Sequence, residues 1–227
     1  MDLVIVTTVV TAATAAFQGQ QPYDLVDLPT LKAELNLTDG SKDALLLRWI
    51  TQASAAAAKF CNCVFPVETV QDQIFPPRDY FPVPVLIGGV IPLQLSRWPV
   101  SESPTVTENG IALVEDTDFI VKYDVGQLLR LDVNGWPKRW PALPTVVQYP
   151  AGYKPTDPDF ADVADAVIRM VKARFFAQLR DPALRSENIT GAYEATYWFA
   201  SGPGAAIGNL TPDVQALLEK YRVPVVG

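Results

Sequence analysis

The chain has 227 residues, of which 49% are hydrophobic and 19% are charged, so it can bury a core and is not a disordered polymer. Its formal net charge of −7 gives little attraction to a nucleic-acid backbone. This argues against a dedicated DNA-coating or DNA-reading role, but not against the acidic wall of a channel that passes DNA. The absence of histidine excludes Ser–His and Cys–His nucleophile pairs and removes the commonest metal ligand.

Residues 1–23 begin with an apolar run rich in β-branched side chains, without a Lys or Arg ahead of it. A secretory signal has a basic start and a membrane span has a longer apolar run, so we expect neither. The pattern predicts a strand followed by an Ala/Thr arm. We expect the protein to reside in the cytoplasm of the cell that makes it.

Residues 24–66 predict the first part of a helical core. Asp27 can cap a short helix over residues 28–35, and a turn at residues 38–41 precedes a longer helix that ends near Cys61. Alanines fill most of residues 53–58, which gives a surface that a helix of the same chain or of a neighbour can approach closely. The apolar stripe of the longer helix is Leu46, Ile50, Ala53, Ala57 and Phe60.

Residues 67–152 predict an inserted antiparallel β module. Asn109-Gly110 is the strongest short hairpin signal, and it separates candidate strands at 105–107 and 111–114. A second hairpin joins 119–123 to 127–131 around Gly126. Further strands are expected at residues 71–75, 90–95 and 145–149, with a proline-rich loop after the first of them.

Residues 153–200 predict the second part of the helical core. Thr156 or Asp157 can cap a helix over residues 159–179, and Pro158 suits its first turn. A strand over residues 192–199 is expected to follow the helix. The apolar stripe predicted for this helix consists of Ala164, Val167 or Ile168, Val171 and Phe175.

Residues 201–227 predict a hinge and a short amphipathic helix. Residues 201–204 are Ser-Gly-Pro-Gly, and Thr211-Pro212-Asp213 has the composition of a helix start. The apolar face of this helix is Val214, Leu217, Leu218 and Tyr221. The fold class we predict is therefore α+β, a helical core with an inserted antiparallel β module and a hinged C-terminal helix. We expect the two long helices to touch.

Residues capable of catalysis or cofactor binding do not form a recognisable pattern. There is no Gly-x-x-x-x-Gly-Lys loop and no Gly-x-Gly-x-x-Gly at a helix start. Cys61 and Cys63 form a lone Cys-x-Cys, which falls short of a zinc site and favours packing at a helix end. Asp116 and Asp118 favour a solvated turn over a calcium loop. We expect no catalytic residue, no cofactor, no metal and no enzymatic activity.

Local strings in a shared order resemble the head–tail connector, also called adaptor or head-completion, family of long-tailed phages and gene-transfer particles. They extend over roughly residues 25–222, and the catalytic signatures of enzymes are not among them. The strings are LPTLKAEL (28–35), DALL (43–46), RWPV (97–100), GQLL (126–129), WP (136–137 and 140–141), YPAGY (149–153), LRSE (184–187) and LLEKYR (217–222).

The resemblance implies a structural virion protein at the head–tail interface, assembled in the cytoplasm of a bacterial host. Its subunits would form a ring, usually of twelve, beneath the portal protein, and would extend the DNA channel without specific DNA binding or a membrane. The helical parts pack side by side in such rings, so Ala53, Ala57 and Phe60 would pack between subunits. A further connector or a tail-terminator protein would attach below. The C-terminal segment commonly docks onto the portal in this family, so Val214, Leu217, Leu218 and Tyr221 would form the docking face.

Two other interpretations stay open from the sequence. A tail-completion or tail-terminator subunit also forms rings, and six-fold particles would favour it over a connector. A β-rich carbohydrate-binding or hydrolytic module would use Trp136 and Trp140, which flank Pro137-Lys138-Arg139, as a sugar platform. Anchoring of a loop onto the β module is the alternative role for these tryptophans.

Overall fold

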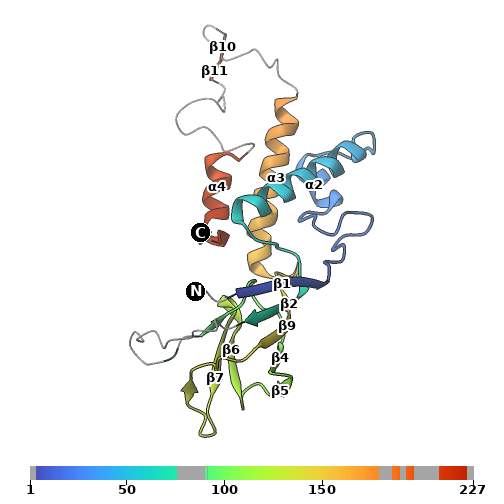
Figure 1. The fold of residues 1–227 in the computed structure, drawn as a ribbon. Helices are drawn as coiled ribbons and strands as arrows, with labels where there is room; N and C mark the ends of the chain where they lie inside the picture. Colours follow the sequence, from blue (N-terminus) through green and yellow to red (C-terminus); the bar gives the residue numbers. More distant parts are fainter. Residues whose placement is uncertain are drawn as a thin grey trace. The chain divides into compact units, whose positions relative to one another are not determined.

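The computed structural model describes residues 4–75, 90, 92–178, 186–189, 193–196 and 210–223. These residues form a mixed α+β fold of four α-helices, two antiparallel sheets and a two-stranded hairpin (Figure 1). The chain divides into two compact units. Unit 1 contains residues 1–14 and 66–154, and unit 2 contains residues 15–65 and 155–227.

Unit 1 contains both sheets, and every pairing between their strands is antiparallel. The larger sheet has the order β1-β2-β9-β4-β5, with β1 at one edge and β5 at the other (Figure 1). Its strands are β1 (Val4–Thr11), β2 (Glu68–Phe75), β9 (Thr145–Ala151), β4 (Thr105–Glu108) and β5 (Ile111–Leu113). The smaller sheet contains β3 (Leu93–Gln94), β7 (Gln127–Leu131), β6 (Phe119–Lys122) and β8 (Pro137–Lys138).

Both predicted hairpins are confirmed. Asn109 and Gly110 have φ of 49° and 81°, the left-handed pair that a two-residue turn between β4 and β5 requires. A 3₁₀ turn, η1 (Tyr123–Val125), and Gly126 at φ 61° connect β6 to β7. A Cβ at Gly126 would lie 3.0 Å from Cβ of Trp98. Glycine therefore suits this position both because it adopts a positive φ readily and because it has no side chain to collide with Trp98.

The strand at residues 145–149 is longer than predicted. β9 continues to Ala151, and Pro150 lies opposite Thr69 of β2. Proline cannot donate a backbone hydrogen bond, but its carbonyl oxygen accepts one from the Ser101 amide at 2.9 Å. The strand predicted at 90–95 is shorter, because only Leu93 and Gln94 pair with β7.

An apolar cluster buried in unit 1 has members from both sheets. Trp140 belongs to it, and its indole nitrogen donates to the Leu128 carbonyl oxygen at 3.1 Å. This confirms that a proline-flanked tryptophan anchors a loop onto the β module. Trp136, by contrast, is 71% exposed. The two rings therefore do not form a shared platform for a sugar.

A buried carboxylate joins three segments of unit 1. Asp72 of β2 is fully buried, and it accepts hydrogen bonds from the Thr7 hydroxyl (2.7 Å) and from the Tyr149 hydroxyl (2.7 Å). It also accepts bonds from the Ser96 amide (2.8 Å) and hydroxyl (2.7 Å). Burial raises the pKa of Tyr149, so its hydroxyl stays a donor. These bonds attach β1, β9 and the segment after β3 to the centre of β2.

Unit 2 contains the four helices, α1 (Leu28–Glu34), α2 (Asp43–Cys61), α3 (Pro158–Ala177) and α4 (Pro212–Leu218). Asp27 caps α1 as predicted, because its carboxylate accepts from the Thr30 amide at 3.3 Å. A 3₁₀ turn, η2 (Glu219–Tyr221), extends α4. The prediction that the two long helices touch is confirmed, since α2 packs against α3 (Figure 1).

Some predicted elements differ from the structure or lie outside the described residues. The strand expected at residues 192–199 is present over its described residues as β11 (Tyr193–Thr196), and it pairs with a strand that was not predicted, β10 (Ser186–Ile189). The predicted hinge at residues 201–204 and the proline-rich loop at residues 76–84 lie outside the described residues. The buried stripe of α3 is Phe160, Val163, Ala166, Val167, Met170, Val171 and Phe175. Ala164 and Ile168 are half-buried beside it.

Candidate assembly surfaces

The buried face of α2 is displaced from the predicted stripe. Its buried residues are Leu46, Trp49, Ile50, Ser54, Ala57 and Cys61. Sequence reasoning missed Ser54, whose hydroxyl accepts from the Leu25 amide at 3.1 Å and so satisfies a buried backbone donor. Because alanine surrounds the helix at residues 55–58, periodicity alone could not decide between neighbouring faces.

The three residues predicted to pack between subunits differ in how much of their surface is exposed. Ala57 is fully buried within unit 2. Ala53 and Phe60 are half-buried, and the Arg222 guanidinium lies 5.4 Å from the centre of the Phe60 ring. Only Ala53 and Phe60 therefore present surface, and their role in subunit packing stays a prediction.

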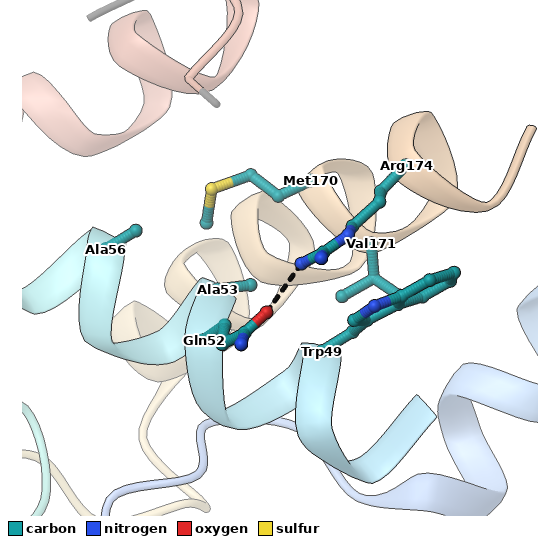
Figure 2. Close-up of a pocket in the computed structure, with 7 residues that line it drawn as sticks. All are labelled: Trp49, Gln52, Ala53, Ala56, Met170, Val171 and Arg174. Atoms are coloured by element: carbon teal, nitrogen blue, oxygen red, sulfur yellow. Dashed lines mark hydrogen bonds between the residues drawn. The ribbon is translucent and has the colours of Figure 1, made fainter. Parts of the chain in front are cut away.

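A groove of about 280 Å³ lies between α2 and α3 (Figure 2). Ala53 and Ala56 form its floor on the α2 side, and Met170 and Val171 face them from α3. The Arg174 guanidinium lies 4.9 Å from the Trp49 ring centre and donates to Oε1 of Gln52 at 2.6 Å. The small side chains on α2 therefore leave an apolar hollow, and the Arg174 guanidinium closes one end of it.

The predicted docking face on α4 lies largely against its own unit. Val214 and Leu218 are fully buried, Tyr221 is buried and Leu217 is half-buried. The Tyr221 ring meets Phe65 edge-on at 5.9 Å, and its hydroxyl donates to the Asp159 carbonyl oxygen at 2.7 Å. The structure thus brings the four side chains together but leaves Leu217 as the one with the most accessible surface among them. A role in portal docking stays a prediction.

Backbone and thiol contacts hold the end of α4 to the end of α2. The Val223 amide donates to the Cys61 carbonyl oxygen at 2.8 Å, and the Cys61 thiol donates to the Leu218 carbonyl oxygen at 3.5 Å. Cys61 is the last residue of α2 and is buried, which confirms its predicted packing role at a helix end. A hydrogen bond with Cys63, together with burial, raises the pKa of Cys61, so this thiol stays protonated.

Ion pairs surround α4 on its exposed side. Lys220 pairs with Asp162 and with Asp159 (3.6 Å), and Arg169 pairs with Asp213 at 3.4 Å. The hydrogen bond from Lys220 lowers the pKa of Asp162, and the bond from the Thr211 hydroxyl lowers that of Asp213. Exposed pairs of this kind contribute little to stability. Burial of the apolar face, rather than charge, therefore holds α4 in place.

The acidic turn at Asp116 is held by its own hydrogen bonds. Asp118 accepts from the Val114 amide at 2.9 Å and from Arg130 at 3.4 Å, and the bond from Val114 lowers the pKa of Asp118. Within the described ranges, no group of three acidic or cysteine side chains is placed to hold a metal ion. No helix in this part of the chain is both long and apolar enough to cross a membrane.

Comparisons with known proteins bear on the fold. No family model matches the chain, and no curated protein matches it by sequence. Among solved structures, a chain of "Virion of native gene transfer agent (GTA) particle" matches with 17% identity over 97% of both chains and a TM-score of 0.50. A chain of "Neck of empty GTA particle computed with C6 symmetry" matches with 17% identity over 98% of both chains and a TM-score of 0.48. The chain therefore shares its fold with a chain of a gene transfer agent virion.

Proposed function

We propose that the chain is a structural, non-enzymatic subunit of the neck of a phage-like or gene-transfer particle, a connector that forms a ring under the portal. The observation that carries the proposal is the shared fold with a virion chain over 97% of both chains. The ordered sequence strings over roughly residues 25–222 support the same assignment, because their resemblance to the connector family lies in the sequence and not in the fold.

The role of such a subunit is mechanical, and the residues supply surfaces rather than reactive groups. We assign contacts between neighbouring subunits to the half-buried Ala53 and Phe60 on α2. The net charge of −7 suits a channel lining to which DNA does not adhere. A portal protein above and a further connector or tail-terminator protein below are the partners that this role requires.

Electron microscopy of the purified protein mixed with its portal tests the assignment. We expect closed rings on the portal with twelve-fold symmetry, because a connector continues the portal channel. Free six-fold rings that do not attach to the portal would instead favour a tail-completion or tail-terminator subunit. A protein that stays monomeric with portal present would contradict both versions of the proposal.

Docking to the portal is assigned to residues 201–227, with Leu217 as the residue that can act without disturbing the fold. Use of Val214, Leu218 and Tyr221 would require α4 to leave unit 2, where they are buried. Leu217 is half-buried and needs no such release. An apolar side chain on a short helix fits a hydrophobic groove on a larger partner.

Replacement of Leu217 by glutamate should reduce attachment to portal-bearing heads about tenfold or more, because a charge would enter an apolar contact. Co-sedimentation of the purified protein with such heads measures the attachment. Ala216→Glu is the matched control, since Ala216 is exposed on the same helix and gains the same charge. Equal attachment of the two variants, at equal melting temperature, would remove Leu217 from the docking face.

A further inference from the structure

Strand β1 forms a long free edge of the larger sheet. Within the described residues it pairs with one strand, β2, so one row of its backbone N–H and C=O groups faces away from any neighbouring strand (Figure 1). Its valines are accessible, with Val4 55%, Val6 45%, Val9 46% and Val10 49% exposed. Unpaired edges of this kind are templates for pairing with another chain.

The sequence of β1 lacks the features that usually prevent an edge strand from pairing with another chain. The strand reads VIVTTVVT from Val4 to Thr11, without a charged residue or a proline. All its residues are β-branched, which suits an extended backbone. The other edge strand, β5, has only the three residues Ile111–Leu113, so the two edges of the sheet are not equivalent.

β1 is also held firmly in its extended form. Ile5 packs against the core of unit 1, and the Thr7 hydroxyl donates to the buried Asp72. A partner strand therefore meets a backbone that is already ordered, which lowers the entropy cost of pairing.

We propose that β1 pairs antiparallel with β1 of a second copy of this chain, which joins two five-stranded sheets edge to edge. A second copy fits because the strand is complementary to itself. A two-fold axis perpendicular to the sheet maps each face of the sheet onto itself. Residues that lie opposite each other across the axis must therefore have their side chains on the same face. The pair belongs to the free protein and not to the ring proposed above, because neighbours in a cyclic ring all point the same way and cannot be related by a two-fold axis.

The irregularity in β1 defines the register. The ladder with β2 is regular from Val4 to Val9 and shifts between Val9 and Thr11, so the midpoint of the regular part lies between Val6 and Thr7. A pair centred on Thr7 uses residues 4–10 of the strand, whereas a pair centred on Val6 uses only residues 4–8, so Thr7 gives the longer ladder. Centring the pair on Thr7 places Val6 of one copy opposite Thr8 of the other, and Ile5 opposite Val9. These are β-branched pairs without like charges, which is the favourable case for cross-strand neighbours. Pairing of β1 with the three-residue β5 would give a shorter ladder and a head-to-tail contact, which builds a ring or an open filament rather than a two-fold dimer.

Charge substitutions at Val6 and Thr8 test both the pairing and its register. In Val6→Lys/Thr8→Lys, lysines would face each other across the two-fold axis, and dimerisation should weaken about a hundredfold. In Val6→Lys/Thr8→Glu, each lysine would face a glutamate, and dimerisation should stay within about tenfold of the natural chain. Both side chains are exposed in the single chain, so the fold of each variant should persist.

Sedimentation velocity measures the mass of each protein from about 1 µM to about 200 µM. Val133→Lys serves as the control, because Val133 is 99% exposed and lies outside β1. A concentration-dependent dimer that the double-lysine variant loses and the lysine–glutamate variant keeps supports the proposal. A natural chain that stays monomeric, self-association that is equal in both double variants, or an open-ended series of larger species would overturn it.

Discussion

Replacement of Asp72 by alanine should lower the free energy of unfolding by about 3–5 kcal/mol. The substitution leaves the buried Tyr149 hydroxyl without its closest acceptor and removes the acceptor of the Ser96 amide. Each buried donor that loses its partner costs about 1–3 kcal/mol. The Thr7 hydroxyl also loses its bond, so β1 should loosen first.

Urea unfolding followed by far-ultraviolet circular dichroism measures this effect. Asp124→Ala is the control, because Asp124 is an exposed aspartate of the same unit, and it should change the stability by less than about 0.5 kcal/mol. Asp72→Asn keeps the shape but offers one acceptor oxygen instead of two, so its loss should be intermediate. An alanine variant as stable as the control would mean that the carboxylate does not hold these segments together.

Replacement of Leu218 by alanine should cost about 2–5 kcal/mol of unfolding free energy, because Leu218 is fully buried on α4. Its neighbour Leu217 is half-buried and has the same side-chain volume. Leu217→Ala should therefore cost less than about 1.5 kcal/mol. The two variants remove the same atoms from adjacent positions of one helix.

Urea unfolding of both variants decides where α4 lies in the free protein. A large loss for Leu218→Ala and a small one for Leu217→Ala would show that α4 is packed on unit 2 before any partner arrives. Equal and small losses would show that α4 is detached in solution. In that case all four predicted side chains would be available to the portal.

Local sequence signals predicted the elements whose cause is itself local. Asn109-Gly110 forces a tight turn, and Asp27 caps the helix that begins at the next residue. Pro158 lies in the first turn of α3, as its fixed φ favours. Each of these features depends on residues within a few positions of one another, so a short stretch of sequence contains all the residues that cause it.

The contact between α2 and α3 was predicted, but individual hydrogen bonds between distant segments could not be. Asp72 appears in the sequence as an ordinary polar residue of a strand, and only the fold brings Thr7, Ser96 and Tyr149 to it. Ser54 was missed for the same reason, since its partner is the Leu25 amide. The placement of β1 beside β2 follows from neither segment alone.

The order of pairing in the larger sheet has a consequence during synthesis of the protein. β1 is made before β2, and Val4 pairs with Phe75, which leaves the ribosome much later. At roughly 5–20 residues per second, the nascent strand waits on the order of ten seconds for its neighbour. Throughout that interval the uncharged, valine-rich β1 lacks its partner strand on each ribosome that has passed β1 but has not yet completed β2. Yield of this protein should therefore depend on chaperones that bind extended apolar segments and on the speed of translation through residues 12–67.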